Sequence, residues 1–396
     1  MTVRIPLARP EITDRDREAV LAVLQTPNLS LGPKLREFEE AVCAYTGSKH
    51  AVAVNSGTSA LHIAVRALEL ERGAEVILPS FTFSALLNVT LQEGLCPKFV
   101  DIDPDTYNAN PEMVGTAITS RTRLILAVHT FGFPFDLEAI REIVQRALPA
   151  GQSAKQIHWL EDACEALGAE VHGRKAGTLG EAGLFAFYPN KQITTGEGGM
   201  LITSDTKLAA HALRLRNQGR DPALGWNQHA EIGFSYRISE MNCALGISQL
   251  RRIEDVVARR QKLAEAYDRQ LAHIGEIVRP PVRSNLGRIS WFAYPIRLAA
   301  DFQAKDRDWI CHSLQSKGIA TGRYFAPLHR QPLLRTHPFA RNARGTRGGN
   351  VPRLPQTEFI ADRIIALPFF NELTEQEVHE VCGALEESIR ELRQKI

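Results

Sequence analysis

The strongest candidate for chemistry in this sequence is a lysine that follows an apolar run and precedes a glycine-rich turn. Gly183–Tyr188 (GLFAFY) has the length and composition of a buried strand, and Lys191 follows it after two residues. Thr194–Gly199 (TTGEGG) then lets the backbone fold tightly. Apolar surroundings favour the uncharged form of an amine, so a lysine in this position suits a nucleophile that forms a Schiff base. The alternative is an ordinary surface lysine, and a second stretch argues against it.

That second stretch supplies a carboxylate. The apolar run Ile157–Leu160 predicts a strand that delivers Glu161 and Asp162 at its carboxyl end, where ligands bind in open α/β sheets. An enzyme that uses pyridoxal 5′-phosphate needs a lysine to carry the cofactor and a carboxylate to pair with the pyridinium nitrogen. Asp162 could instead cap a helix that begins at Ala163. The combination with Lys191 favours the cofactor interpretation.

A third stretch is typical of a phosphate site. His50–Val54 (HAVAV) predicts a short strand, the turn Asn55–Ser59 (NSGTS) follows, and Ala60–Leu70 has apolar residues at helical spacing. The free N–H groups and the positive end of such a helix attract anions. A turn of this kind also suits a plain helix cap, so it matters chiefly as the third part of one site.

With these three stretches in place, the sequence resembles the DegT/StrS family of pyridoxal-phosphate-dependent (nucleotide-)sugar aminotransferases, which have fold type I. The resemblance covers essentially the whole chain, and the matching motifs follow the family's order and spacing. They are NSGTSAL (55–61), EVILPSFTFSA (75–85), FVDIDPDTYN (99–108), HTFGFP (129–134), EDACEALGA (161–169), GRKAGTLGEAGLFAFYPNKQITTGEGGM (173–200), LRNQGR (215–220) and GFSYRISEMNCALGISQL (233–250).

The resemblance implies roles for individual residues. Lys191 would be the Schiff-base lysine and Asp162 the partner of the pyridinium nitrogen. The remaining implied contacts are phosphate binding by Gly57, Thr58 and Ser59, stacking of Phe83 on the cofactor ring, cofactor contacts of Glu165, Ser235 and Arg237, and substrate contacts of Tyr324 and His329.

Three positions depart from the family pattern. Ala186 stands where the family usually has a serine that binds the phosphate, and Ser235 stands where it usually has an asparagine that reaches the neighbouring subunit, although Arg237 is kept. Glu165 stands where Gln or His commonly touches the ring hydroxyl. Because a carboxylate facing a phenolate would be repelled, we expect Glu165 to be either protonated or turned toward a cationic group.

Composition bounds the class of protein. The chain has 396 residues, with 47 Lys+Arg and 45 Asp+Glu, hence a formal net charge of +2. That balance argues against a nucleic-acid or membrane-surface partner. Six cysteines are scattered singly, without the spacing of a metal or redox site, and are expected to be reduced thiols in the cytoplasm. No apolar run is long enough for a transmembrane helix.

The pattern of elements predicts the fold class. Strand-like runs at 50–54, 75–78, 97–101, 123–129, 157–161, 183–188 and 199–203 alternate with helical patterns, which is typical of an α/β protein with a mostly parallel sheet. The resemblance implies fold type I, with residues 1–250 as N-terminal segment and large domain. Residues 251–396 would form a connector helix and a small C-terminal α+β domain. One long helix is expected from Ser239 to about His273.

The resulting expectation is an aminotransferase that moves an amino group, from L-glutamate, to a nucleotide-linked keto-sugar in the biosynthesis of amino sugars for polysaccharides or antibiotics. The resemblance also implies a homodimer with active sites at the subunit interface. An aminotransferase acting on a keto-cyclitol or another cyclic ketone is an alternative, and so is a non-catalytic regulatory protein with the same fold. The presence of both Lys191 and Asp162 argues against the last. The composition of the loops gives no code for the nucleotide or the sugar.

Overall fold

The fold is organised around a seven-stranded sheet, seen in a computed structural model that describes residues 3–149, 151, 153–225, 228–337 and 352–395. The strand order is β1-β9-β8-β5-β4-β2-β3. The strands are β1 (His50–Val54), β2 (Glu75–Pro79), β3 (Cys96–Val100), β4 (Thr122–Val128), β5 (His158–Asp162), β8 (Ala182–Ala186) and β9 (Gly199–Thr203). All neighbouring pairs are parallel except those of β9, which is antiparallel to both β1 and β8. The predicted mostly parallel seven-stranded sheet is confirmed.

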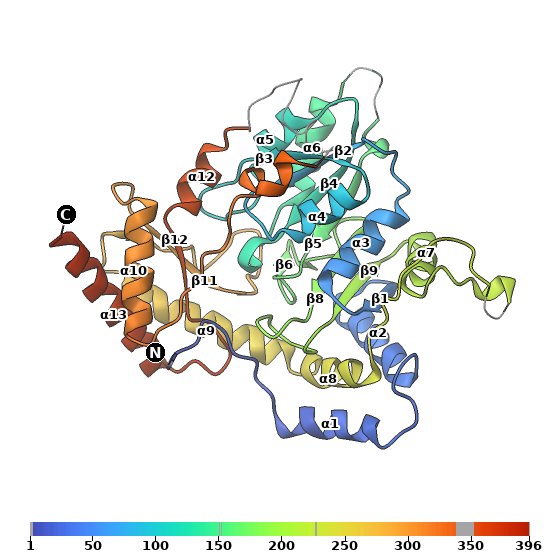
Figure 1. The fold of residues 1–396 in the computed structure, drawn as a ribbon, viewed down its shortest axis with the longest axis horizontal. Helices are drawn as coiled ribbons and strands as arrows, with labels where there is room; N and C mark the ends of the chain where they lie inside the picture. Colours follow the sequence, from blue (N-terminus) through green and yellow to red (C-terminus); the bar gives the residue numbers. More distant parts are fainter. Residues whose placement is uncertain (1–2, 150, 152, 226–227, 338–351, 396) are drawn as a thin grey trace.

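Helices cover both faces of this sheet (Figure 1), because side chains alternate between the two faces along each strand. In β1, Val52 and Val54 belong to one core cluster, whereas Ala51 and Ala53 belong to another. The first cluster is closed by α3 (Gly57–Ala67), α4 (Ala85–Gln92) and α7 (Thr206–Arg216). The opposite face is covered by α2 (Pro33–Thr46), α5 (Pro111–Ala117), α6 (Leu137–Ala147) and α8 (Glu240–Leu250).

The C-terminal part forms a second, smaller layer. Its three-stranded antiparallel sheet has the order β10-β11-β12, with β10 (Ile277–Val278), β11 (Tyr294–Leu298) and β12 (Ile364–Leu367). Three helices pack with it around one aromatic-rich core: α9 (Ile253–Leu271), α10 (Ala304–Ser316) and α13 (Glu375–Arg393). Ile5, near the N-terminus, is fully buried in the same core. The division of the chain at residue 250 stays a prediction.

The remaining elements are short or peripheral. They are α1 (Asp14–Leu24), the hairpin of β6 (Glu170–Val171) and β7 (Arg174–Lys175), and α12 (Pro355–Ala361). Thr13 and Asp16 form a capping box at the start of α1. No helix among the described residues combines the length and the apolar character needed to cross a membrane.

The long helix expected between 239 and 273 is two helices. α8 ends at Leu250 and α9 begins at Ile253, so the prediction of one continuous helix was wrong. At the junction, Arg252 donates to the backbone oxygen of Glu11 at 3.0 Å and to the carboxylate of Asp16 at 2.7 Å. Apolar periodicity did not reveal this interruption, since both helices keep a buried face.

Candidate active site

The lysine identified from the sequence lies on a tight turn between two antiparallel strands. β8 ends at Ala186, and the chain then turns so that the Lys191 N–H donates to the Tyr188 carbonyl at 2.9 Å. The glycine-rich segment that follows closes the turn, and Gly196 has the left-handed φ of +82° that favours glycine. β9 then pairs back onto β8. The strand end and the turn together carry the Lys191 side chain into a cavity of about 470 Å³.

The Lys191 amine has two close neighbours in that cavity. Its Nζ lies 4.1 Å from the centroid of the Phe292 ring and 3.6 Å from Oε1 of Glu165. The side chain is 13% exposed, so both contacts act in a place largely closed to water. An ammonium ion can therefore be held there by a carboxylate on one side and a ring face on the other.

Glu165 is turned toward this amine. Its Oε2 accepts a hydrogen bond from the Phe131 backbone N–H at 2.9 Å, which leaves Oε1 for Lys191. Burial raises the pKa of the Glu165 carboxyl above its ordinary value, and the charge of Lys191 opposes that rise. Of the two states expected from the sequence, the structure places the carboxyl against a cationic group.

Asp162 forms another wall of the cavity, at the carboxyl end of β5. Its Oδ1 accepts the Cys164 backbone N–H at 3.0 Å, which fixes the orientation of the carboxylate. Its neighbour Glu161 points to the opposite face of the sheet and is fully buried. There it accepts backbone N–H groups of Gly177, Leu179 and Gly180. Consecutive acids on one strand therefore serve different faces.

The third wall is the start of α3. Ser56 caps this helix by accepting the Ser59 N–H at 3.0 Å, and Gly57 and Thr58 in its first turn line the cavity. The first N–H groups of a helix have no partner within it and can bind an anion. Gly57 cannot be replaced freely, because a Cβ there would lie 2.7 Å from the Cβ of Ala186 and 3.2 Å from Sγ of Cys164.

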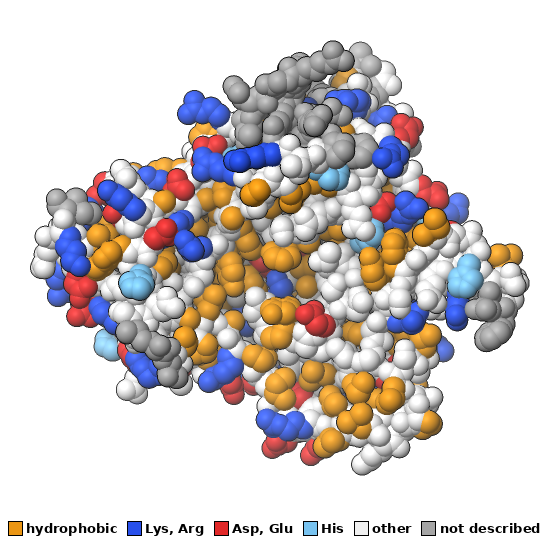
Figure 2. All heavy atoms as spheres, viewed as in Figure 1, with side chains coloured by type: hydrophobic (Ala, Val, Ile, Leu, Met, Phe, Trp, Pro, Cys, Tyr) orange, Lys and Arg blue, Asp and Glu red, His pale blue; other side chains and the backbone are white. Residues whose placement is uncertain are grey.

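The structure brings most of the predicted site residues together. The cavity is lined by Gly57, Thr58, Phe83, Asp162, Glu165, Lys191 and Tyr324. Phe83 is 59% exposed despite its large apolar ring, so it stands free at the rim. In the space-filling view, hydrophobic side chains gather in the central part of the face, between the large and small layers (Figure 2).

Four predicted residues lie outside this lining. The Ser59 hydroxyl donates to Asn55 at 2.7 Å, turned back into its own loop. The ring of His329 is buried, with Nδ1 2.6 Å from the Ser80 hydroxyl and Nε2 3.3 Å from the Glu358 carboxylate, and burial lowers its pKa. Ser235 and Arg237 lie on the turn before α8.

That turn is held by Asn217 at the end of α7. Ser235 forms an isolated β-bridge with Asn217, and Arg237 Nη1 donates to the Asn217 side chain at 3.0 Å. Neither side chain lines the cavity of its own chain. Any contact of Ser235 or Arg237 with a cofactor stays a prediction.

Sequence reasoning missed several residues that line the cavity. Phe292 and Phe325 come from the C-terminal layer, far from Lys191 in sequence, and their apolar surroundings gave no local signal. Asn190 did carry a signal, because it directly precedes Lys191. Its Oδ1 is a buried side-chain oxygen without a hydrogen-bond partner among the described residues. A buried oxygen left without a donor suits contact with a polar ligand.

Arg260 links the site to the C-terminal layer through hydrogen bonds. This fully buried residue of α9 donates to the backbone oxygens of Trp291 at 3.0 Å, Phe292 at 3.2 Å and Lys191 at 3.5 Å. Its Nε donates to the Asn371 side chain at 2.7 Å. Burial lowers the pKa of its guanidinium to about 9. The segments that present Lys191 and Phe292 are thus held by one side chain.

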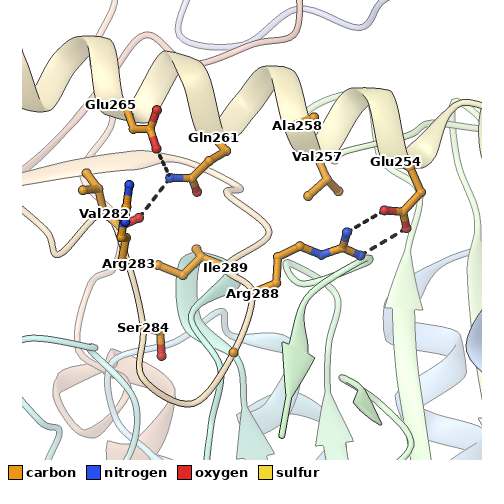
Figure 3. Close-up of a pocket in the computed structure, with 11 residues that line it drawn as sticks. Glu254, Val257, Ala258, Gln261, Glu265, Val282, Arg283, Ser284, Arg288 and Ile289 are labelled. Atoms are coloured by element: carbon orange, nitrogen blue, oxygen red, sulfur yellow. Dashed lines mark hydrogen bonds and ion pairs between the residues drawn. The ribbon is translucent and has the colours of Figure 1, made fainter. Parts of the chain in front are cut away.

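A second hollow of similar size, about 480 Å³, runs along α9 and is called the α9 groove here (Figure 3). It is lined by Glu254, Val257, Ala258, Gln261, Glu265, Val282, Arg283, Ser284, Gly287, Arg288 and Ile289. Its polar groups bind one another: Arg288 makes two hydrogen bonds to Glu254, and Gln261 donates to Glu265 at 3.1 Å and to the Val282 carbonyl at 3.0 Å. The groove therefore offers few free polar groups.

The cavity around Lys191 fits pyridoxal 5′-phosphate. An amine, a carboxylate and a helix N-terminus converge on it, and the ring of Phe83 stands exposed at its rim. The buried Asn190 oxygen and the tight approach of Gly57 to Ala186 agree with a site shaped for a polar, phosphate-bearing ring.

Comparison with known proteins points the same way. The profile of the DegT/DnrJ/EryC1/StrS aminotransferase family matches residues 10–386. GDP-perosamine synthase of Caulobacter vibrioides is 36% identical, over 92% of this chain and 97% of its own length. The structure of DesV from S. venezuelae is 31% identical, covers 98% of both chains and has a TM-score of 0.84. Helicobacter pylori PseC, an aminotransferase in pseudoaminic acid biosynthesis, is 26% identical with a TM-score of 0.88, over 98% of this chain and 99% of its own.

Proposed function

The chain belongs to the DegT/DnrJ/EryC1/StrS aminotransferase family, whose members depend on pyridoxal phosphate, and we propose that it transfers an amino group from L-glutamate to a nucleotide-linked keto-sugar. The observation that carries the proposal is the convergence of Lys191, Asp162 and the start of α3 on one cavity. The nucleotide-linked acceptor is supported by the 36% identity to a protein named GDP-perosamine synthase.

The cofactor supplies, when bound, an aldehyde that takes up the amino group and a ring that draws electrons from the reacting carbon. Lys191 would hold the cofactor covalently, and its amine would serve as the acid and base that moves the substrate proton. Asp162 would pair with the ring nitrogen and favour its protonated form. Gly57 and Thr58 would bind the phosphate through backbone N–H groups, and Phe83 would pack against the ring. Phe292 and Phe325 exclude water from the amine of Lys191.

Two of the implied substrate contacts differ in their support. Tyr324 lines the cavity, and its hydroxyl is a hydrogen-bonding group that can reach a sugar. His329 already binds Ser80 and Glu358, so its contact with substrate would require those bonds to break. The Tyr324 contact is therefore part of the proposal, and the His329 contact stays a prediction.

We further propose a homodimer with active sites at the subunit interface. Among the described lining residues, Lys191 is the one cationic side chain, so the phosphate lacks a charged partner from its own chain. Arg237 lies on a turn away from its own cavity, where a second subunit could use it.

The six cysteines are all free, which agrees with a cytoplasmic location.

The dimer can be tested by mixing two inactive variants, Lys191→Ala and Arg237→Ala. If Arg237 serves the partner's site, hybrid dimers contain one site with both native residues, and about a quarter of the wild-type activity returns on mixing. Recovery of no activity, together with a monomeric mass in solution, would contradict the interface proposal.

The activity itself is tested with the holoenzyme. L-Glutamate should convert the bound cofactor to its aminated form, and a nucleotide-linked keto-sugar from a panel should return the original absorbance. Borohydride treatment and peptide mapping should leave the cofactor on Lys191. An enzyme that takes up no cofactor, or that aminates a keto-cyclitol but no nucleotide sugar in the panel, would overturn the corresponding part of the proposal.

A further inference from the structure

His62 is a buried histidine that the proposed transfer reaction does not use. It lies on α3, and its Nδ1 is 2.8 Å from the Tyr236 hydroxyl oxygen and its Nε2 2.7 Å from the Glu93 carboxylate. We propose that His62 and Tyr236 are positioning residues that hold the turn Asn55–Ser59 in the shape that binds the phosphate of the cofactor. The inference rests on the proposed function of that turn and deepens it.

Glu93 sets the direction of the two hydrogen bonds of the His62 ring. Its other carboxylate oxygen accepts from Arg66 at 3.1 Å. Burial acts to raise the pKa of this carboxyl, but the hydrogen bonds from His62 and Arg66 outweigh it and hold the pKa below its ordinary value. An ionised carboxylate only accepts, so Nε2 of His62 is the donor toward Glu93. In the neutral ring, Nδ1 then accepts the hydrogen bond of the Tyr236 hydroxyl.

Tyr236 connects this pair to the phosphate turn through its backbone. Its ring stacks on that of Phe234 with the centroids 4.8 Å apart, and its N–H donates to the Arg216 carbonyl at 3.0 Å. Its own carbonyl accepts the Asn55 N–H at 3.0 Å. Because the hydroxyl, the ring and the backbone of Tyr236 are all bound, the carbonyl that receives Asn55 is held in one place.

Asn55 in turn holds the residues that line the cavity. It directly follows β1, and its Oδ1 accepts the Ser59 hydroxyl at 2.7 Å. Ser59 donates its N–H to the Ser56 side chain at 3.0 Å, and the two residues between these serines line the cavity. The N–H groups that the first turn of α3 offers to phosphate are therefore held from outside the cavity, by His62 and Tyr236.

The test compares pyridoxal 5′-phosphate with pyridoxal, which lacks the phosphate. Each compound is titrated into cofactor-free protein, and its dissociation constant is measured from the absorbance of the lysine-bound aldehyde. Tyr236→Phe removes one hydroxyl and keeps both the aromatic ring and the carbonyl. We expect it to weaken binding of pyridoxal 5′-phosphate about fivefold, the size of effect that one hydrogen bond has. Binding of pyridoxal should not change, because only the phosphate contacts the turn.

Tyr45→Phe is the matched control. It also removes a hydroxyl that donates to a glutamate, Glu254, at 2.7 Å, but on α2 and outside the cavity lining. Both dissociation constants should keep their wild-type values. Circular dichroism gives the melting temperature of each variant, because a residue that only stabilises the fold changes that temperature and not the ratio of the two constants.

A second variant tests whether the two residues act together. His62→Leu should weaken binding of pyridoxal 5′-phosphate and not of pyridoxal. Adding Tyr236→Phe to it should cause no further loss, since both substitutions remove the same hydrogen bond. Losses that simply add would contradict a joint role.

The outcomes separate this inference from the proposed function. A ratio of the two dissociation constants that stays at the wild-type value in Tyr236→Phe would overturn the positioning role, even if Lys191 binds the cofactor and amino transfer is normal. Equal weakening of both compounds leaves that ratio unchanged and overturns it too. Wild-type protein that binds neither compound would overturn the proposed function, and the positioning role with it.

Discussion

The cavity around Lys191 and the α9 groove have nearly the same volume, about 470 and 480 Å³. They differ in what their polar groups do. In the α9 groove, Arg288 and Glu254 satisfy each other (Figure 3). In the cavity, the Asn190 oxygen has no donor among the described residues, and the first turn of α3 faces open space. Size therefore does not identify the reactive site.

The cavity differs from the groove because charged side chains from separate segments of the sheet converge on it. Two of its carboxylates lie at the end of β5 and just after it, its lysine follows β8, and these carboxylates are anchored separately: Asp162 on the Cys164 N–H and Glu165 on the Phe131 N–H. The groups of the α9 groove come mainly from one helix and an adjoining loop. Open α/β sheets gather ligand-binding groups at their carboxyl ends for this topological reason.

The largest expected effect comes from removing the amine. Lys191→Ala should reduce amino transfer by about 10⁴-fold, because one residue supplies both covalent attachment and proton transfer. Arg288→Met, at the α9 groove, should keep turnover within about twofold and serves as the control. Steady-state kinetics measure both turnover rates. A Lys191→Ala enzyme with near-normal turnover would show that the cavity is not the reactive site.

A smaller loss follows from Asp162. Asp162→Asn keeps the shape and can still accept the Cys164 N–H, but it cannot neutralise a protonated ring nitrogen. Turnover should fall by about 10²-fold, in line with the loss of one electrostatic partner. The bound cofactor should also lose the part of its absorbance that depends on a protonated ring nitrogen. Unchanged kinetics would show that Asp162 has no contact with the ring.

The groove should matter for stability instead. Arg288→Met removes the two hydrogen bonds to Glu254, and partly exposed ion pairs contribute about 0.5–1 kcal/mol to the free energy of unfolding. Urea denaturation measures the change, with Arg283→Met, an exposed arginine of the same groove lining, as the matched control. A loss of activity without a loss of stability would assign the groove a function.

The smallest effect depends on pH. The hydrogen bonds from Arg288 lower the pKa of Glu254 to about 2. A lowered carboxyl pKa contributes stability that is full above the ordinary value of 4.5 and is lost as the pH falls toward 2. The difference in stability between wild type and Arg288→Met should therefore shrink over that range. A difference that stays constant down to pH 2 would contradict the pairing.

Local patterns in the sequence were enough to predict the sheet and the group of residues at its edge. The strands before Asp162 and Lys191 are apolar runs of ordinary length, and strand ends and tight turns are local features. The turn Asn55–Ser59 likewise predicted that a helix, α3, begins close to it. Parallel topology then brings these segments together, so the positions of Lys191 and Asp162 relative to each other follow from the fold class.

Contacts across layers could not be predicted in this way. His329 was expected near the substrate, and that contact stays a prediction, but the hydrogen bonds of its ring to Ser80 and Glu358 carried no signal in the sequence. Phe292 was not expected in the site, yet its ring lies under the Lys191 amine. Both positions depend on how the C-terminal layer packs on the sheet, and that packing has no signature within a few residues of either side chain.

Arg260 has a consequence for how the molecule responds to heat. Its guanidinium holds the carbonyl of Lys191, the Trp291–Phe292 segment and Asn371 at once. A rise in temperature that loosens α9 therefore releases the backbone of the reactive lysine in the same event. We expect calorimetry to give one melting peak, with activity disappearing at its onset, whereas Arg260→Met should split the peak in two.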